Sequence, residues 1–226
     1  MDLRGKRALV TGGGAGIGKA IAMRLVENGC SVTIWELNEG VIAGAVDELE
    51  RHAAANAPVR ARTKAPMNRN PASGSDDSGD RERTAHVFGH QIDVTNRPRV
   101  RALVETAIHE MGGIDILVNN AGHLAPGTIL DQPPEVWETT VKVNLTAVID
   151  VTHAILPHMY KRNEGHVVNI SSASSVVGVS GLAVYSATKW AVWGLTEALR
   201  HEAKNSDSQV RFSSVHPNYI ATGMFE

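Results

Sequence analysis

Short apolar runs rich in β-branched residues alternate along this chain with longer segments of helical character. The runs are RALVT (7–11), SVTIW (31–35), VFGHQID (87–93), IDILVN (114–119), HVVNIS (166–171) and VRFSSV (210–215). Several are apolar at consecutive positions, as strands must be when helices cover both faces of their sheet. Strands that alternate with helices predict an α/β fold, a parallel, doubly wound sheet of six strands in a single domain over residues 1–226.

One region interrupts this alternation. Residues 57–85 are rich in proline, serine, glycine, asparagine and charged residues and contain almost no large apolar side chain. Such a segment buries too little surface to offset the entropy lost on ordering. We therefore predict a disordered surface insertion between the second helix and the third strand. A regulatory or partner-binding arm is the alternative.

Composition narrows the range of functions. The chain has 226 residues, a formal net charge of −2 and one cysteine, Cys30. The near-neutral charge gives no electrostatic basis for binding nucleic acid. A single cysteine forms no intrachain disulfide, which favours a reducing compartment and predicts a cytoplasmic protein.

Other classes of protein lack their usual sequence signals here. No apolar run reaches the roughly 18–20 residues of a membrane span, and no apolar signal-peptide core follows the initial MDLRGKR. The histidines are scattered without metal-ligand spacing, so we expect no metal site. These absences favour a small-molecule function.

A glycine-rich turn follows the first apolar run and opens the next helix, in the sequence TGGGAGIGKAIAMRL (11–25). Glycines are needed where a backbone turns tightly and where a pyrophosphate approaches the amide groups. The helix N-terminus supplies free N–H donors and a partial positive charge. This placement predicts the phosphate-binding turn of a Rossmann-type nucleotide-binding fold. The candidate cofactor residues in it are Thr11, Gly12, Gly14, Gly16, Ile17 and Gly18.

The second run is followed by Glu36, eighteen residues after Gly18. In a nucleotide-binding half-fold this position meets the adenosine ribose, where a carboxylate accepts hydrogen bonds from both hydroxyls. The same carboxylate would repel a 2′-phosphate, and neither Ala15 nor Leu37 offers a positive charge. We therefore predict NAD as the preferred cofactor, with NADP as the alternative.

A tyrosine and a lysine stand four residues apart in VYSATKWAV (184–192). On a helix, Tyr185 and Lys189 project from the same face. The pair admits two interpretations, a catalytic device or two amphipathic side chains on one helix face. The local sequence does not choose between them.

Taken together, the motifs resemble those of the short-chain dehydrogenase/reductase (SDR) superfamily over essentially the whole chain. They are TGGGAGIG (11–18), DV (93–94), NNAG (119–122), VNL (143–145), NISS (169–172) and YSATK (185–189). Each is short, but their order and spacing together are specific. The segments around NISS and YSATK, and TGMFE near residue 226, are similar to the branch acting on steroids, retinoids and related lipophilic alcohols.

The resemblance implies an oxidoreductase in which Tyr185 is the general acid/base during hydride transfer. A phenol with a pKa of about 10 is a poor base near neutrality, so Lys189 is expected to stabilise the phenolate, lower the tyrosine pKa and bind the nicotinamide ribose. Ser172 would orient the substrate oxygen, whereas strand alternation points Ser171 to the opposite face. Asn144 would hold a water that relays protons from Lys189, or would be a buried helix asparagine bonded to backbone.

The resemblance also implies further cofactor and substrate contacts. Those for the cofactor are Asp93, Val94, Asn120, Ala121, Gly122, Tyr185, Lys189, Pro217, Ile220 and Thr222. The substrate pocket is expected to be mostly apolar, with His123, Leu124, Ala173, Val179, Leu182, Met224 and Phe225 around it. A homodimer could form through the helices that contain Asn144 and Tyr185.

Three features depart from the family pattern. Ser175 stands where the family usually has glycine, and Asn218 follows Pro217 where glycine is again usual. Asparagine tolerates a left-handed backbone better than most residues, so we expect it to be accommodated. The sequence also stops at Glu226, before the helix pair and seventh strand that usually follow. We expect cofactor binding to survive this better than turnover.

Three hypotheses remain open at this point. The leading one is an NAD-dependent enzyme that interconverts an apolar alcohol and a ketone or aldehyde. The first alternative, a non-catalytic NAD(H)-binding or interaction protein, would not need the whole set of Asn144, Ser172, Tyr185 and Lys189. The second, a nucleotide-sugar epimerase, usually has a Thr-Gly-x-x-Gly-x-x-Gly turn, and the glycine spacing here differs from it.

Overall fold

The computed structural model describes residues 2–56 and 85–220, and its elements follow the predicted alternation. The strands are β1 (Arg7–Thr11), β2 (Ser31–Glu36), β3 (Val87–Gln91), β4 (Ile116–Asn119), β5 (Gly165–Ile170) and β6 (Val210–Val215). The helices are α1 (Gly16–Glu27), α2 (Glu39–Asn56), α3 (Arg97–Met111), α4 (Pro134–Val141), α5 (Ala147–Arg162) and α6 (Ala183–Asn205). A π-helical segment, η2 (Lys142–Thr146), and a 3-10 turn, η3 (Ala173–Ser175), complete them. All six predicted strands are confirmed.

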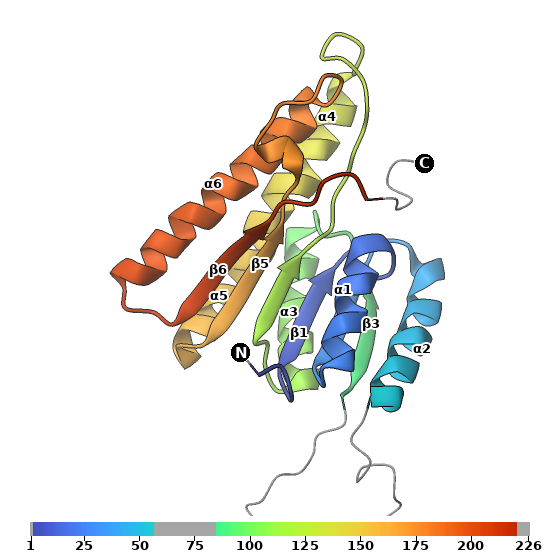
Figure 1. The fold of residues 1–226 in the computed structure, drawn as a ribbon, viewed down its shortest axis with the longest axis vertical. Coiled ribbons are helices and arrows are strands. Elements are labelled where there is room, and N and C mark those ends of the chain that lie inside the picture. The colour runs from blue at the N-terminus through green and yellow to red at the C-terminus, as the bar shows by residue number, and fades with distance from the viewer. Residues whose placement is uncertain (1, 57–84, 221–226) are drawn as a thin grey trace, which may run out of the picture.

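The six strands form one parallel sheet in the order β3-β2-β1-β4-β5-β6 (Figure 1). The chain builds outward from β1 to β3, returns to the other side of β1 and continues outward to β6. The winding therefore reverses between β1 and β4. Ligands of such sheets bind outside the carboxyl ends of the strands at this point. The predicted doubly wound α/β fold is confirmed, and its topology places the glycine-rich turn at the ligand-binding edge.

Alternate residues of the central strands build two apolar clusters, one on each face of the sheet. Leu9 of β1 and Leu117 of β4 pack with residues of α3, α5 and α6. Ala8 and Val10 of β1 pack instead with residues of α1 and α2, which lie together in front of the sheet in Figure 1. Because both faces of β1 are fully buried, its run is apolar at consecutive positions.

The first helix ends where the sequence indicates. α1 ends at Glu27, Asn28 caps it, and Gly29 takes a left-handed φ of 81° that favours glycine. Cys30 is buried just beyond, with its thiol 3.0 Å from the carbonyl oxygen of Leu3. Burial raises the pKa of this thiol to about 12, so it is a packing residue rather than a nucleophile.

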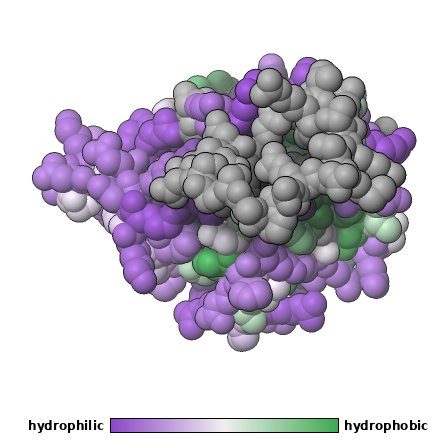
Figure 2. Space-filling view, turned by 90° about the horizontal axis from the view of Figure 1, so that it is seen from below, coloured by the Kyte–Doolittle hydropathy of each residue, from purple (hydrophilic) through white to green (hydrophobic). Residues whose placement is uncertain are grey.

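The predicted insertion at 57–85 lies, apart from Ala85, outside the described residues. In the part of the chain that the structure describes, the helices are too short or too polar to traverse a bilayer. Within the same residues, no His, Cys, Asp and Glu side chains cluster as metal ligands would. Seen from below, the described surface is mostly hydrophilic, with a few hydrophobic residues near its middle (Figure 2).

Candidate active site

The turn after β1 is so closely packed that three of its glycines, Gly13, Gly14 and Gly18, have no room for a side chain. A Cβ at Gly18 would overlap the carbonyl oxygen of Gly12 and the side-chain amide of Asn120. A Cβ at Gly14 would lie 2.8 Å from Cγ of Glu36. The turn therefore presents bare backbone beside the N-terminus of α1, where an anionic group could approach.

Glu36 ends β2 and lies against this turn. Its Oε2 accepts a hydrogen bond from the N–H of Gly14 at 3.1 Å. Its Oε1 accepts from the N–H groups of Leu37 at 2.8 Å and Asn38 at 3.3 Å. The structure thus brings Glu36 and the glycine-rich turn together, although Gly14 and Glu36 are 22 residues apart in sequence.

Thr11 and Asn120 tie together the ends of the two central strands. The Thr11 hydroxyl accepts from the N–H groups of Asn120 and Ala121, both at 3.0 Å. The Asn120 amide donates in turn to the carbonyl oxygens of Thr11 and Gly12, both at 3.0 Å. These bonds join the ends of β1 and β4, so the two side chains shape the ligand edge by fixing its backbone.

Three further predicted cofactor residues lie together in a groove beside α1. Ile17, Pro217 and Ile220 line one apolar groove of about 610 Å³ between α1 and strands β4–β6. Glu36 does not line this groove. Ile17 belongs to the glycine-rich turn, so the groove connects the end of this turn with the loop after β6.

The remaining predicted cofactor residues follow β3 and the chain end. The carboxylate of Asp93 accepts from the N–H and the hydroxyl of Thr95, both at 2.8 Å, and so stabilises its own turn. Val94 is buried and packs in the cluster against α3 and α5. Gly122 follows Ala121 in the loop after β4. Thr222, with the pocket candidates Met224 and Phe225, lies outside the described residues.

Tyr185 and Lys189 lie in the first turns of α6 and are both buried, with exposed fractions of 8% and 5%. The Lys189 Nζ lies 5.6 Å from the centroid of the Tyr185 ring. It donates a hydrogen bond to the carbonyl oxygen of Ile170, the last residue of β5, at 2.9 Å. Lysine is seldom fully buried in proteins. A buried ammonium held at a strand end favours the catalytic interpretation over two amphipathic side chains.

The ionisation of this pair differs from the expectation. Burial raises the pKa of Tyr185 above its ordinary value, and a hydrogen bond with Ser172 acts in the opposite direction. Burial lowers the pKa of Lys189 to about 8. We expected the ammonium to lower the tyrosine pKa, but burial takes from the phenol the water that would stabilise a phenolate, and this effect is the largest. At neutral pH the phenol is therefore protonated.

Ser172 and Ser171 take the different positions that strand alternation predicts. The Ser172 hydroxyl hydrogen-bonds Tyr185 and accepts from the N–H of Ser174 at 3.1 Å, where it caps η3. Ser171 is buried, and its hydroxyl donates to the carbonyl oxygen of Lys189 at 2.9 Å. Ser172 therefore faces Tyr185, whereas Ser171 ties α6 to the end of β5.

Asn144 is fully buried in the π-helical segment η2. Its Oδ1 accepts from the N–H of His123 at 2.7 Å, and its Nδ2 donates to the His123 carbonyl at 2.8 Å and to the Thr188 hydroxyl at 3.3 Å. Both ends of the amide thus join the loop after β4 to α6. This geometry matches the backbone-bonded interpretation of Asn144, and the relay role draws no support from its side chain.

Two other asparagines hold the helices of the site against the sheet. Asn119 donates to the Thr152 hydroxyl of α5 at 2.9 Å and to Oδ1 of Asn169 at 2.8 Å. Asn169 donates to the Thr196 hydroxyl of α6 at 2.9 Å. All four side chains are buried, and buried polar groups that satisfy one another specify a single arrangement. This network fixes how α6 presents Tyr185.

Sequence reasoning assigned no role to His216, although it marked Ser175 as unusual. The Ser175 hydroxyl donates to the Ser172 carbonyl at 2.6 Å and lies 2.7 Å from Nδ1 of His216. The two residues are 41 positions apart, so no local pattern connects them. The only signal in the sequence was the position of His216 directly before Pro217.

Asn218 is accommodated differently from the expectation. Among the described residues other than glycine, only Asn163 and Asp207 have a positive φ. The Asn218 side-chain oxygen accepts instead from the N–H of Tyr219 at 2.8 Å. The backbone at Asn218 therefore does not need the left-handed conformation that glycine favours.

Comparison with known proteins agrees with this architecture. The model of the short chain dehydrogenase family matches residues 6–65 and 65–226. The chain is 30% identical to retinol dehydrogenase 10-B of Danio rerio, over 100% of this chain and 64% of that protein. It is 32% identical to the 3-oxoacyl-acyl-carrier-protein reductase FabG of Vibrio cholerae, over 99% of this chain and 77% of that protein. The chain thus spans less than two thirds of the length of the first of these relatives.

Solved structures show the same similarity. A short chain dehydrogenase/reductase from Burkholderia phymatum, determined in complex with NAD, has a TM-score of 0.83 at 29% identity and covers 99% of this chain and 69% of that chain. An NAD+-bound xylitol dehydrogenase has a TM-score of 0.81 at 25% identity and covers 100% of this chain and 74% of that chain. The family match extends over the sheet, the glycine-rich turn and the Tyr185–Lys189 helix, and so the chain belongs to the short chain dehydrogenase family.

Proposed function

We propose that this chain is an NAD(H)-dependent oxidoreductase that interconverts an alcohol and a ketone or aldehyde. The meeting of Tyr185, Ser172 and Lys189 at the end of β5 supports this most. Only β4 separates the ends of β5 and β1, a distance of about 10 Å across the sheet. One extended dinucleotide could therefore contact both the glycine-rich turn and the Tyr185 side chain.

The residues around the turn fit such a dinucleotide. A side chain at Gly14 would collide with Glu36, and one at Gly18 with the Gly12 carbonyl, so the glycines keep the turn tight. The N-terminus of α1 would attract a pyrophosphate. The Glu36 carboxylate would accept hydrogen bonds from the ribose hydroxyls and repel a 2′-phosphate. Bound NAD would supply hydride transfer to or from the substrate carbon. The Burkholderia protein and the xylitol dehydrogenase, both solved with NAD, support the same preference.

The chain's own residues would manage the proton. In the reductive direction Tyr185 donates its proton to the carbonyl oxygen, and its raised pKa keeps the phenol protonated at neutral pH, which is the form this step needs. Ser172, already hydrogen-bonded to Tyr185, would bind the same oxygen. Lys189 would place a positive charge beside the phenolate that remains. In the oxidative direction the same groups would act in reverse.

The test of this proposal is NADH oxidation by the full chain with a panel of ketones and aldehydes. We expect saturable NADH consumption with at least one carbonyl compound, together with NADH binding in its absence. Tight NADH binding without consumption for any member of the panel would point instead to a non-catalytic NAD(H)-binding protein.

We propose an apolar substrate. Candidate residues at the site include Leu124, Val179 and Leu182, and Val179 is 43% exposed. His123 precedes Leu124 in sequence, and its Nδ1 lies 3.1 Å from the Thr140 hydroxyl, so it would add one polar group to a mostly apolar set of candidate residues. The named relatives act on retinol and on 3-oxoacyl groups. Long-chain or ring-containing ketones should therefore be turned over better than small polar ones.

A homodimer through α5 and α6 is also proposed. Ile149 on α5 and Trp190 on α6 are 43% and 49% exposed, and apolar side chains on outward helix faces favour association. Light scattering of the full chain measures the oligomeric state directly. A purely monomeric mass at micromolar concentration would contradict the proposed homodimer.

Glu36→Ala is expected to lower the preference for NAD over NADP by about tenfold or more. The variant loses a charged acceptor for the ribose hydroxyls and relieves repulsion of a 2′-phosphate, and hydrogen bonds to charged groups are worth about 1.5–3 kcal/mol. Titration of both cofactors by fluorescence gives the ratio of their Kd values. Glu39→Ala, an exposed carboxylate at the start of α2, serves as the matched control. An unaltered ratio in Glu36→Ala would remove Glu36 from the ribose site.

Gly18→Ala is expected to raise the Kd for NADH by about tenfold or more. The new Cβ would overlap the Gly12 carbonyl, and overpacking of this kind costs about 1–3 kcal/mol as the backbone shifts. Gly44→Ala is the matched control, because a Cβ at Gly44 meets no atom within 4 Å. Unchanged NADH affinity in Gly18→Ala, measured by the same titration, would contradict the placement of the cofactor at this turn.

A further inference from the structure

A chain of hydrogen bonds leads from the loop after β6 to the backbone of Ser172. Nδ1 of His216 lies 2.7 Å from the Ser175 hydroxyl, and that hydroxyl donates to the Ser172 carbonyl at 2.6 Å. The other ring nitrogen of His216 lies 2.8 Å from the Ser214 hydroxyl. The imidazole also meets the indole of Trp193 edge to face, with ring centroids 5.4 Å apart.

The direction of these bonds follows from the donors and acceptors available. A carbonyl oxygen only accepts, so the single hydroxyl proton of Ser175 is directed to Ser172. The contact between Ser175 and His216 must then be donated by the ring, which places a proton on Nδ1. The Ser214 hydroxyl can donate to Nε2 of the neutral ring. Each polar group in this series of hydrogen bonds then has a partner. Ser175 itself has no exposed surface.

The same two loops are joined at a second point. The N–H of Ala173 donates to the carbonyl oxygen of Pro217 at 2.8 Å, and the N–H of Ser175 donates to the Ser172 carbonyl at 2.9 Å. The Ser172 carbonyl therefore receives both the N–H and the hydroxyl of Ser175. The peptide group between Ser172 and Ala173 is therefore held at its carbonyl by Ser175 and at its N–H by the loop after β6.

We propose that His216, acting through Ser175, is a positioning residue that fixes the backbone of Ser172 and so aims its hydroxyl at the substrate oxygen. This inference rests on the proposed function, because it assigns a role within the same site. The residue that makes the link possible is Ser175, which supplies a hydroxyl at a position where glycine would supply none. Neither Ser175 nor His216 needs to touch the substrate.

The positioning role of His216 and Ser175 is tested by measuring the activity of single and double variants. Ser175→Ala and His216→Leu should each lower kcat by about 10- to 100-fold, since misplacement of a reacting group by about 1 Å costs up to about 100-fold. The KM for NADH should change by less than about threefold. The double variant should be no worse than the poorer single variant, because both changes break one chain. His216→Asn should recover most of the activity lost in His216→Leu, since its amide can place a donor near the position of Nδ1.

A second histidine–serine pair, which joins β5 to β6, provides the control. Nε2 of His166 on β5 lies 2.9 Å from the hydroxyl of Ser213 on β6. Ser213 precedes Ser214 in sequence, yet this pair does not lead to Ser172. Ser213→Ala should therefore leave kcat unchanged, even if it lowers the stability of the fold as much as Ser175→Ala does. Thermal unfolding of each variant separates a loss of fold from a loss of positioning.

A spectroscopic measurement tests the link without turnover. The 15N NMR signals of the His216 ring should show a protonated Nδ1 in the wild type and a change of tautomer or of exchange rate in Ser175→Ala. An unprotonated Nδ1 in the wild type, or full kcat in Ser175→Ala, would overturn the positioning role while the oxidoreductase proposal stands. No carbonyl turnover by the wild type would overturn the proposed function, and the positioning role with it.

Discussion

Tyr185→Phe is expected to lower turnover by about 10²–10⁴-fold, the usual contribution of a general acid or base. The variant removes one hydroxyl and keeps the ring, which is only 8% exposed. The Lys189 ammonium remains bonded to the Ile170 carbonyl, so the end of β5 keeps its structure. The chemical step alone loses its proton donor, and the affinity for NADH should stay within a few-fold.

The measurement is kcat with the best carbonyl substrate, together with the Kd for NADH from fluorescence titration. Tyr160→Phe on α5 is a matched control, because Tyr160 is also partly buried but belongs to the cluster around α3 and α5. Its kcat should equal that of the wild type. Undiminished turnover in Tyr185→Phe would rule out the acid/base assignment, whatever the effect on NADH binding.

Local sequence patterns were enough to predict most of the fold. Strands such as Arg7–Thr11 and Val210–Val215 lie where consecutive apolar residues indicated them, because a strand covered on both faces must be apolar throughout. The contact of Glu36 with Gly14 was also foreseeable. In a parallel sheet the ends of adjacent strands meet at one edge, so fixed positions in sequence become neighbours in space.

The sequence did not allow us to predict properties that depend on burial or on partners far away in the chain. The spacing of Tyr185 and Lys189 suggested an ammonium that lowers the pKa of a phenol, but burial raises the pKa of Tyr185 instead, and the end of β5 provides Ile170 as the hydrogen-bond partner of the ammonium. The sequence left Asn144 either as a water holder or as a buried asparagine bonded to backbone, and the contacts of its amide with the loop after β4 match the second interpretation. In each case the deciding contact comes from another element of the fold, with no trace in the local pattern.

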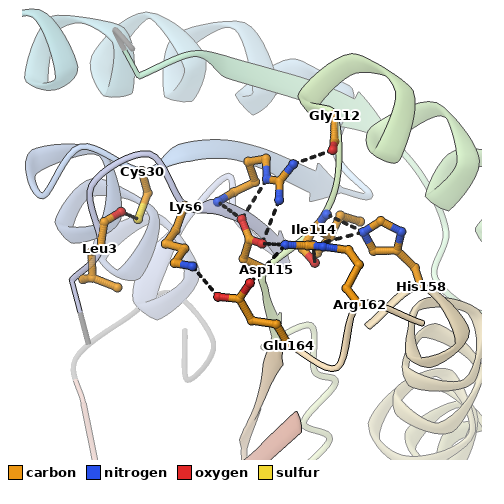
Figure 3. Close-up of polar contacts among 10 residues, drawn as sticks. Leu3, Lys6, Cys30, Gly112, Ile114, Asp115, His158, Arg162 and Glu164 are labelled. Carbon is orange, nitrogen blue, oxygen red and sulfur yellow. Dashed lines mark hydrogen bonds and ion pairs between the residues drawn. The ribbon is translucent and has the colours of Figure 1, made fainter. Parts of the chain in front are cut away.

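A cluster of charges around Asp115 also escaped sequence reasoning. Asp115 precedes β4 and is only 3% exposed as a side chain. The Arg7 guanidinium donates to both of its oxygens, at 2.7 and 2.8 Å, and the Arg7 N–H adds a third bond at 2.9 Å. Arg162, from the end of α5, donates at 2.5 Å. Figure 3 shows the carboxylate between these groups, so it joins β1, β4 and α5.

The pKa of Asp115 reflects this setting. Burial on its own would raise the pKa, but the hydrogen bonds from Arg7 and Arg162 outweigh it and lower the pKa to about 2. An unfolded aspartate titrates near pH 3.9. The carboxylate therefore stabilises the fold fully above about pH 5, and this contribution is lost as the pH falls through 2.

Asp115→Ala is expected to lower the free energy of unfolding at pH 7 by about 3–5 kcal/mol, because removal of the buried carboxylate leaves two arginine side chains, only 17% and 28% exposed, without compensation. Glu164→Gln is the matched control. Glu164 binds Lys6 and lies near Arg162, but its side chain is 53% exposed, and exposed ion pairs contribute about 0–1 kcal/mol. Urea unfolding at a series of pH values measures both variants. The deficit of Asp115→Ala should be constant above about pH 5 and shrink toward pH 2, whereas a deficit below 1 kcal/mol at neutral pH would show that β1, β4 and α5 are held together without this carboxylate.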